Sequence, residues 1–542
     1  MEKNTPLTNP YLNKGTAFTV VGREKYGMNG LLPSRVETID EQADRVLAQV
    51  DELADAYNQH RFLMSIYSTN RTLFFNAISR DVKKLLPVIY TPTIAEAVKK
   101  FSQHYFNPKD AVYLSVNEPD QIEQVLKNGA ADLSEVKLMV ITDGEGVLGI
   151  GDWGINGAAI SIGKLAVYTV AAGLDPSEVL PIVIDAGTNN QALLDAPSYL
   201  GLKEQRVHGE EYLHYIDQFV QTAARLFPNV LFHWEDFGRE HADVILNTYR
   251  QTLCTFNDDI QGTGIMMVAA LNSVVKVTEA PLSEHTVLIF GAGTAGIGIA
   301  DTIYSELVNK GLEAEEAKKR IVLYDRYGLI HSEQKELTSG QKRYAVDKDS
   351  LASIPGNLLE TIHLIKPTVL IGCSGQTDAF SEEVVKAMQT HTNRPAIFPI
   401  SNPSELAEAK AEDIIKWTDG NGLVVTGSPT EPIVYKGVTY QIGQANNALL
   451  YPGLGQGLII TRAHHVTDGI LLAAAHSVNE MLDLSKPGEA LLPDVSKLRE
   501  VSKLVATAVI TKAVEDKVSR VPIKEPAEAV EESIWEPVYK SV

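Results

Sequence analysis

The sequence predicts an α/β fold in at least two domains. Its 542 residues exceed the roughly 250–300 residues at which a single core stops growing. From about residue 131, short apolar runs of strand length alternate with helical patterns, which is typical of a parallel sheet covered by helices. We expect a helical region at 1–130, an α/β domain at 131–280 completed by helices at 454–520, a second α/β domain at 281–453, and a C-terminal arm at 521–542.

A glycine-rich turn between a predicted strand and a predicted helix is the most informative motif. The strand is the apolar run Val287–Phe290, and the turn that follows contains Gly291, Gly293, Thr294, Ala295 and Gly296. In such a turn the glycines permit a tight bend, a close approach of pyrophosphate, and helix packing on the strand. The helix N-terminus then favours phosphate groups. The alternative is a glycine turn without a ligand, but strand, turn and helix together predict a Rossmann-type dinucleotide-binding domain.

The next predicted strand bears on which dinucleotide is bound. It spans Ile321–Tyr324 and is followed by Asp325, slightly further from the glycines than the usual ~20 residues. A carboxylate there can accept hydrogen bonds from a ribose and would repel a 2′-phosphate, so we expect NAD. Two later strands, Thr368–Gly372 and Ala396–Ile400, run into small polar residues that include Asn402. We expect Asn402 on the nicotinamide and substrate side of the crevice.

Composition and charge exclude several classes of partner. The chain has 44% hydrophobic and 22% charged residues and a net charge of −21, which argues against a nucleic-acid or anionic membrane surface. Its two cysteines, Cys254 and Cys373, lack metal-type spacing and indicate a reducing compartment. We see no secretory leader, and no apolar run approaches the ~18 residues of a membrane span. We therefore expect a cytoplasmic protein.

Two pairs of adjacent carboxylates follow predicted strands. Glu235 and Asp236 come after the strand Val230–His233, and Asp258 and Asp259 follow a shorter apolar run. Ligands of parallel sheets bind at the carboxyl ends of strands. Adjacent carboxylates would repel one another, whereas a divalent cation would draw them together, and oxygen ligands suit Mg²⁺ or Mn²⁺. Solvated loop carboxylates or helix caps are the alternative for either pair alone.

Two further candidate residues lie in helical surroundings. Lys164 stands among apolar residues in the predicted helix Ile160–Tyr168. It is either a lysine that extends its amine to the surface or one whose amine is kept neutral by burial and acts as a base. Pro87 and Pro92 predict an extended segment at Ile89–Thr91, which puts Tyr90 at a junction into a helix. From local sequence alone, Tyr90 is a buried aromatic residue.

The N-terminal and C-terminal regions offer two other motifs. Thr38 and Glu41 have the spacing of a capping box at the start of a helix. Near the end of the second α/β domain, Asn446 and Asn447 are consecutive amides. These amides either orient a substrate carboxylate or tie loops together.

The motifs together resemble the malic enzyme family along nearly the whole chain. The resemblance rests on these segments: Leu12–Phe18, Tyr90–Thr93, Gly151–Gly157, Ile162–Leu165, Asp185–Asn190, Glu235–Phe237, Phe256–Thr263, Ser401–Pro403 and Asn446–Asn447. It implies NAD-dependent oxidative decarboxylation of L-malate to pyruvate and CO₂ with Mn²⁺ or Mg²⁺. It also implies a homo-oligomer, a dimer or tetramer, with the N-terminal helices in the interface.

The resemblance also implies a role for individual residues. Glu235, Asp236 and Asp259 would be the metal ligands, Lys164 the general base and Tyr90 the general acid. Asp258 would support them as a further carboxylate. The substrate-orienting amides would be Asn402 and Asn447, with Asn446 beside them.

One departure from the family pattern concerns a substrate-binding arginine. Many malic enzymes have Glu-Arg where this chain has Glu145-Gly146, and that arginine holds a substrate carboxylate. We expect Arg239 to replace it. This glycine and the segments Gly151–Gly154, His233–Arg239 and Ile442–Asn447 also resemble malolactic enzymes, which retain NADH and release L-lactate. Tyr90–Thr93 and Cys373–Thr377 favour the malic enzymes proper.

Two alternatives come from other functional classes. A metabolite-binding protein without turnover would not need Lys164, Tyr90 and three metal carboxylates, all of which are present. An amino-acid dehydrogenase also joins a substrate domain to a dinucleotide domain, but it has no need of the paired carboxylates. Dependence of activity on Mn²⁺ would exclude it.

Overall fold

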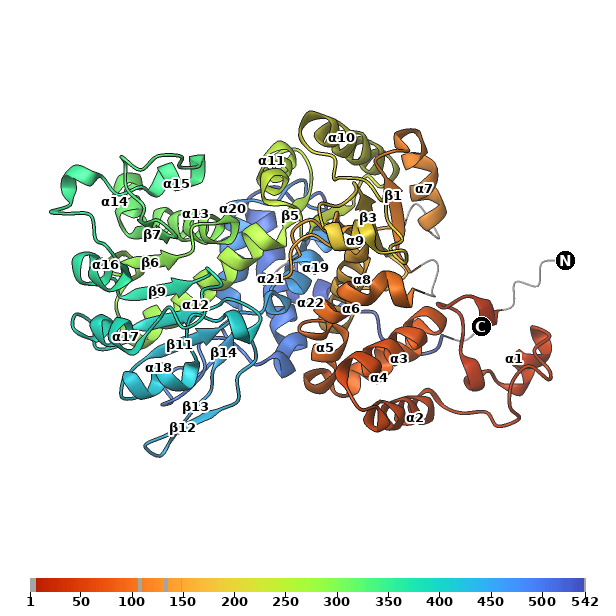
Figure 1. Ribbon diagram of the computed structural model, residues 1–542. Coiled ribbons are helices and arrows are strands. Elements are labelled where there is room, and N and C mark those ends of the chain that lie inside the picture. The colour runs from red at the N-terminus through yellow and green to blue at the C-terminus, as the bar shows by residue number, and fades with distance from the viewer. Residues whose placement is uncertain (1–5, 106–109, 131–134, 148, 541–542) are drawn as a thin grey trace. The chain divides into compact units, whose positions relative to one another are not determined.

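The chain folds into two compact units, each built around its own sheet (Figure 1). The computed structural model describes residues 6–105, 110–130, 135–147 and 149–540. Unit 1 comprises Met1–Thr255, Arg462–His465 and Ala527–Val542, and unit 2 comprises Phe256–Thr461 and Val466–Pro526. The four regions expected from the sequence remain a prediction, since compactness alone does not define a functional domain.

Unit 1 combines a helical N-terminal part with a five-stranded sheet. Its helices are α1 (Val20–Lys25), α2 (Ile39–Glu52), α3 (Ala56–Thr69), α4 (Arg71–Arg80), α5 (Val82–Ile89), α6 (Thr93–His104), α7 (Ile122–Gly129), α8 (Ala158–Ala172), α9 (Gln191–Asp195), α10 (Gly209–Leu226) and α11 (Arg239–Tyr249). The capping box is confirmed, because Thr38 and Glu41 cap α2 reciprocally. The extended segment expected at Ile89–Thr91 is wrong at Ile89, which ends α5, and Pro87 lies inside that helix.

The sheet of unit 1 has the strand order β1-β3-β2-β4-β5. The strands are β1 (Val112–Ser115), β2 (Leu138–Thr142), β3 (Val179–Asp185), β4 (Leu231–Trp234) and β5 (Thr255–Asn257). The pairs β1–β3, β2–β3 and β2–β4 are parallel, as the alternating pattern predicts. β1 lies in a region that the sequence predicts to be mostly helical. The boundary between the two units falls within β5.

Unit 2 is built on a seven-stranded sheet with the order β14-β11-β10-β9-β6-β7-β8. The strands are β6 (Val287–Phe290), β7 (Ile321–Asp325), β8 (Gly328–Leu329), β9 (Val369–Gly372), β10 (Ala396–Pro399), β11 (Leu423–Thr426) and β14 (Gly443–Gln444), beside a hairpin of β12 (Ile433–Tyr435) and β13 (Val438–Tyr440). All pairs of the large sheet are parallel except β7–β8. The chain leaves β6 toward β7 and later returns to β9 on the other side of β6, so the topology reverses between β6 and β9.

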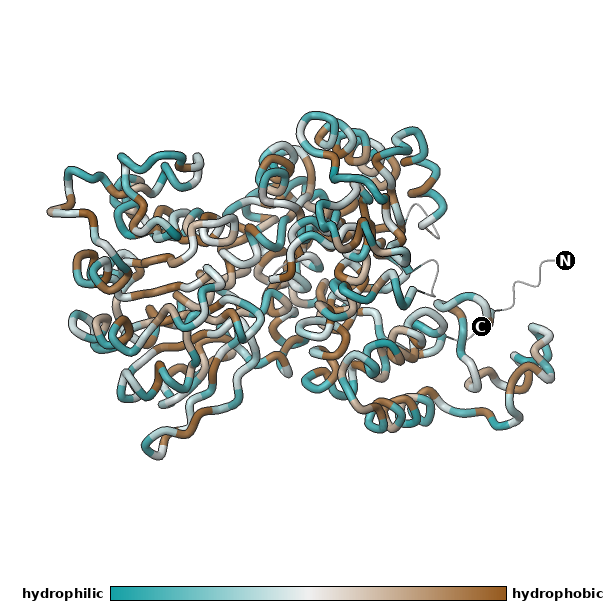
Figure 2. Tube along the Cα trace, in the orientation of Figure 1, coloured by the Kyte–Doolittle hydropathy of each residue, from teal (hydrophilic) through white to brown (hydrophobic). Residues whose placement is uncertain are grey.

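Some helices of unit 2 cover a face of this second sheet, and others pack on one another. They are α12 (Thr263–Thr278), α13 (Thr294–Asn309), α14 (Ala314–Lys319), α15 (Ser339–Tyr344), α16 (Leu358–Ile365), α17 (Glu382–Gln389), α18 (Ala411–Trp417), α19 (Tyr451–Thr461), α20 (Asp468–Ser477) and α21 (Leu498–Glu515). On one face, Ile362, Val385 and Ile414 of α16, α17 and α18 pack with Leu288 and Leu370 of the strands. In Figure 2 these strands accordingly carry much of the brown that marks hydrophobic residues.

Two helical segments of the core are unusually rich in apolar residues. Segments Gly154–Ala172 and Asp258–Thr278 are long and apolar enough to cross a membrane. However, 100% of the apolar window of the first and 67% of that of the second is buried inside the protein. Helices buried to this extent serve as core elements, so they are weak evidence for a membrane span.

The C-terminal arm is packed onto unit 1. It contains α22 (Pro526–Glu532), on which Val530 is buried. Further along, the Trp535 ring packs edge-on against Phe75 with centroids 5.8 Å apart, and its backbone N–H donates to the carbonyl of Gly173. The Tyr539 hydroxyl donates to Gln42. The arm therefore ties α2, α4 and the end of α8 together.

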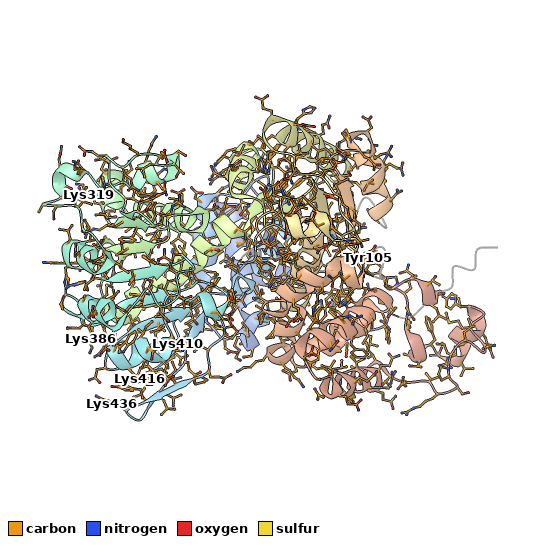
Figure 3. All side chains as sticks on the ribbon, in the orientation of Figure 1. Tyr105, Lys319, Lys386, Lys410, Lys416 and Lys436 are labelled. Carbon is orange, nitrogen blue, oxygen red and sulfur yellow. The ribbon has the colours of Figure 1, made fainter. Side chains whose placement is uncertain are left out.

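The surface of unit 2 carries lysines that are paired with acidic neighbours. Figure 3 labels several of them on outer helices and on the β12–β13 hairpin. Lys319, Lys386, Lys416 and Lys436 pair with Glu316, Glu382, Glu412 and Asp419, respectively. Exposed pairs of this kind contribute little stability, but they offset each other's charge, so these lysines do not form a basic patch.

Candidate functional site

The first predicted carboxylate pair lies at the end of β4 in unit 1. Glu235 and Asp236 are only 4% and 3% exposed, so neither is a solvated loop carboxylate. Asp236 has a φ of 55°, a left-handed conformation that costs a residue other than glycine of order 1–3 kcal/mol and is common at functional sites. Its backbone carbonyl accepts a hydrogen bond from the N–H of Gly146. The structure thus holds two buried carboxylates in a strained turn at a strand end.

Lys164 of α8 reaches the same place. Its side chain is 2% exposed, and its Nζ lies 2.6 Å from Oε1 of Glu235. The interpretation that this lysine extends to the surface is therefore wrong, because α8 is buried on all sides. The carboxylate compensates for the desolvation of the ammonium group.

Glu235 is also the middle of a buried chain of polar side chains. Its Oε2 lies 3.0 Å from Nε2 of His233, and Nδ1 of that ring lies 2.8 Å from the Tyr168 hydroxyl. Tyr168 and His233 are both fully buried. The network Lys164–Glu235–His233–Tyr168 fixes the orientation of the Glu235 carboxylate from two sides.

Tyr90 lies against the same helix. It is 8% exposed, and the Lys164 ammonium group is 5.4 Å from the centre of its ring. The close approach depends on Gly163, where an added Cβ would lie 3.1 Å from Cδ2 of Tyr90. The structure therefore brings Tyr90, Lys164 and Glu235 together within unit 1.

A second buried network involves Arg206, which the sequence did not single out. Its Nε and one terminal nitrogen donate to the two oxygens of Asp152 at 3.1 and 2.7 Å. The other terminal nitrogen lies 3.4 Å from the buried carboxylate of Asp143. Burial lowers the pKa of Arg206, whereas the carboxylates of Asp143 and Asp152 raise it, and the net result is a raised pKa. This arginine joins the end of β2 to the Gly151–Gly157 segment.

Gly146, which stands where many malic enzymes have an arginine, is closely packed against a neighbouring turn. A Cβ added at Gly146 would lie 2.6 Å from the carbonyl oxygen of Phe237. Any side chain at this position therefore requires a shift of the turn that carries Asp236. Arg239, the expected replacement, begins α11 directly after this turn. The structure describes the backbone of Arg239 but not its side chain.

The glycine turn of unit 2 has the geometry that a dinucleotide needs. Gly291 has a φ of 123°, and a Cβ there would lie 2.7 Å from the Cys373 carbonyl carbon at the end of β9. A Cβ at Gly296 would lie 1.8 Å from the Gly291 carbonyl oxygen, whereas Gly293 faces open space. Thr294 and Ala295 begin α13. The turn lies at the topological reversal between β6 and β9, where such sheets bind ligands.

Other predicted residues of unit 2 lie at strand ends. Asp325 ends β7, and its Oδ1 accepts a hydrogen bond from the backbone N–H of Tyr327 at 2.7 Å. Asn402 precedes a cis proline after β10 and accepts a hydrogen bond from Ser428. Both side chains are thus held by local hydrogen bonds.

The second carboxylate pair lies in a π-helical turn, Asp258–Gly262, between β5 and α12. Such turns are rare and often lie at functional sites. Nδ2 of Asn447 donates to Oδ2 of Asp258 at 3.1 Å, and a Cβ at Gly262 would lie 2.1 Å from the Asp258 carboxylate. Asn446 caps the following turn through its own side chain. Of the two amides, Asn447 therefore contacts the predicted carboxylate and Asn446 shapes the loop.

Sequence reasoning missed Arg206, His233 and Tyr168. His233 is the last residue of the predicted strand Val230–His233 and stands two residues before Glu235, which was a usable signal, because residues two apart in a strand face the same side. Arg206 lies in an irregular segment, and nothing in its local sequence indicates that it meets Asp143 and Asp152.

Comparison with known families and proteins gives a consistent result. Residues 67–250 match the N-terminal domain of malic enzyme, and residues 260–514 match the NAD-binding domain of malic enzyme. The chain is 47% identical to a malolactic enzyme of Lactiplantibacillus plantarum over 99% of this chain and 98% of that protein. It is 46% identical to NAD-dependent malic enzyme 3 of Bacillus subtilis over 99% and 96%, respectively.

Solved structures agree on the fold. A malic enzyme from Pyrococcus horikoshii superposes with a TM-score of 0.58 at 22% identity, over 83% of this chain and 88% of the other. A malic enzyme from Entamoeba histolytica gives the same TM-score at 19% identity, over 94% and 90%. At these identities the likeness concerns the fold alone.

Proposed function

The chain belongs to the malic enzyme family, and we propose that it catalyses oxidative decarboxylation of L-malate to pyruvate and CO₂ with reduction of NAD. The observation that carries this proposal is the buried contact between Lys164 and Glu235. It joins a candidate base to a candidate metal ligand at a strand end, beside the buried Tyr90.

We propose that Glu235, Asp236 and Asp259 hold Mn²⁺ or Mg²⁺. The fit is supported by the donor set, which consists of carboxylate oxygens alone. Glu235 and Asp236 follow β4, and Asp259 follows β5, its neighbour in the strand order. The tight turn at Gly291 and Gly296 supports the binding of NAD. A Cβ at either glycine would collide with backbone atoms of this turn or of the segment after β9.

The residues would divide the chemistry among them. When bound, NAD accepts the hydride from C2 of malate, and the divalent cation acts as a Lewis acid on the substrate oxygens. Lys164 would take the proton of the C2 hydroxyl, and Tyr90 would donate the proton that C3 needs after CO₂ departs.

The remaining polar residues would position the substrate. Asn447 orients Asp258 through its 3.1 Å hydrogen bond, and we propose that Asn402, Asn446 and Asn447 place the substrate carboxylates. Arg239 remains our candidate for the cation that replaces the arginine absent at Gly146. Arg239→Lys keeps the charge but loses the bidentate fork, so the KM for malate should rise while NAD binding is unchanged.

A second candidate function is malolactic activity, in which NAD stays bound and L-lactate is released. It is favoured by the 47% identity to a malolactic enzyme and by glycine at 146. The 46% identity to a NAD-dependent malic enzyme favours the first candidate by nearly the same measure.

One experiment separates these activities. Purified protein receives L-malate, Mn²⁺ and less NAD⁺ than malate, and NADH, pyruvate and lactate are measured over time. Pyruvate and NADH formed in equal amounts support the malic enzyme. Lactate in excess of the NAD⁺ supplied supports the malolactic enzyme. Neither product, with NAD still bound tightly, would overturn both proposals.

Assembly and location complete the proposal. We propose a homo-oligomer, a dimer or tetramer, and the exposed apolar side chains of Val20, Val21 and Leu31 near the N-terminus support it. Light scattering during size-exclusion chromatography gives the mass directly. The expected cytoplasmic location rests on composition and stays a prediction.

A further inference from the structure

Three potential metal ligands outside the proposed reaction meet in unit 1. They are Glu145, His208 and His241, and one ligand atom of each lies within 4.8 Å of the other two. Nδ1 of His241 is 3.5 Å from Oε2 of Glu145, and Nδ1 of His208 is 3.9 Å from Oε1 of Glu145. Ligand atoms around a tetrahedral ion with bonds of about 2.0–2.2 Å are about 3.2–3.6 Å apart. Small side-chain movements would therefore close this cluster around an ion.

Two of these atoms are buried without a hydrogen-bond partner. The His241 side chain is only 4% exposed. Among the residues that the structure describes, neither Nδ1 of His241 nor Oε2 of Glu145 has a partner within hydrogen-bonding geometry. A buried polar atom without a partner costs about 1–3 kcal/mol, so a positive ion between the two atoms would remove that cost.

The fold holds the three side chains in place. Glu145 follows β2, His208 precedes α10, and His241 lies in the first turn of α11. The two imidazole rings stack with centroids 5.5 Å apart, and the Tyr212 ring packs on His241 at 4.3 Å. A Cβ at Gly238 would lie 2.0 Å from the Glu145 carboxylate. Glycine at 238 is thus what allows Glu145 to approach His241.

We propose that Glu145, His208 and His241 form a second metal site that binds a transition-metal ion such as Zn²⁺. Two imidazoles and one carboxylate suit Zn²⁺, whereas the all-oxygen set at the strand ends suits Mg²⁺ or Mn²⁺. His208 is 37% exposed, so solvent can supply the fourth ligand. The ion would tie the loop after β2 to the first turn of α11.

The tautomer of His208 sets a further condition. The side-chain amide of Asn189 lies 3.1 Å from Nε2 of His208. Ligation through Nδ1 places the ring proton on Nε2, so Asn189 must turn its amide oxygen toward that nitrogen. Asn189→Asp supplies an acceptor in either orientation and should strengthen metal binding.

The test uses the full-length protein, stripped of metal and titrated with Co²⁺ in a large excess of Mg²⁺. The Mg²⁺ occupies oxygen ligands, and tetrahedral Co²⁺ is recognised by its visible absorption bands. The expected result is one bound Co²⁺ per chain, displaced by Zn²⁺. His241→Ala and His208→Gln should each abolish the bands, with folding checked by circular dichroism. If one of the two variants fails to fold, the other decides.

Two control variants make the result specific. Asp236→Asn alters the proposed catalytic site and should leave the Co²⁺ bands unchanged. His464→Ala/His465→Ala removes another pair of adjacent histidines, whose rings are 5.5 Å apart, and should also leave them unchanged. The proposal is overturned if the wild type shows no such bands, or if the bands survive both His241→Ala and His208→Gln. None of these readouts depends on turnover of malate.

Discussion

The ammonium group of Lys164 lies 2.6 Å from the Glu235 carboxylate in the interior of unit 1. Both side chains are at most 5% exposed, so each compensates for the burial of the other. Removing one partner of such a pair costs about 3–5 kcal/mol, because it leaves a buried charge alone, whereas removing both costs much less. Stability and chemistry can therefore be measured separately at this pair.

We predict that Lys164→Met lowers both stability and activity, and that a second change restores only stability. In metal-free buffer Lys164→Met should lose about 3–5 kcal/mol of unfolding free energy, and Lys164→Met/Glu235→Gln should recover most of it. Turnover of malate should fall by roughly 10²–10⁴-fold in the single variant and not return in the double variant. Urea unfolding and NADH formation are the measurements. Additive losses of stability would show that the two residues are not coupled.

Arg206 gives a prediction about pH. Burial raises the pKa of Asp143, and the Arg206 guanidinium opposes that rise without cancelling it. Arg206→Met removes the opposition, so the pKa of Asp143 rises further above its unfolded value of about 3.9. A carboxyl group with a raised folded pKa contributes stability that is full below its unfolded pKa and is lost as pH rises through the folded pKa. Arg206→Met should lose about 3–5 kcal/mol of unfolding free energy at pH 7 and clearly less near pH 5.

Urea unfolding at the two pH values measures this difference. Arg225→Met is the matched control, because Arg225 is 59% exposed and pairs with the exposed Glu123. The loss of unfolding free energy in Arg225→Met should stay below about 1 kcal/mol. A loss of stability in Arg206→Met that is the same at both pH values would contradict the assignment to Asp143.

The sequence predicted elements well where a short contiguous apolar run defines a strand. β6 begins and ends where its apolar run Val287–Phe290 does, because a strand buried on both faces needs no polar alternation. It failed at Pro87, which lies inside α5, since a helix of eight residues can lose one backbone hydrogen bond and still be held by its buried leucines. It also failed at Arg206, whose role depends on Asp143 and Asp152 meeting it from distant parts of the chain.

Gly146 yields a prediction in which restoring the family arginine does not help. In Gly146→Arg and in Gly146→Ala, the new Cβ meets the Phe237 carbonyl at 2.6 Å and displaces the turn that bears Asp236. Overpacking of this kind costs about 1–3 kcal/mol. Both variants should therefore be less stable than the wild type and should bind Mn²⁺ more weakly. Thermal unfolding and Mn²⁺ titration test this, and a lower KM for malate in Gly146→Arg would contradict it.

Asp325 yields a prediction about the choice between NAD and NADP. Its Oδ1 accepts the hydrogen bond of the Tyr327 backbone, and asparagine can keep that bond while losing the charge. Asp325→Asn should therefore preserve the turn and raise kcat/KM for NADP relative to NAD by about tenfold, which corresponds to about 1.4 kcal/mol. Asp325→Ala loses the turn as well, so it should weaken use of both dinucleotides. An unchanged ratio in Asp325→Asn would mean that the carboxylate does not face the 2′-position of the ribose.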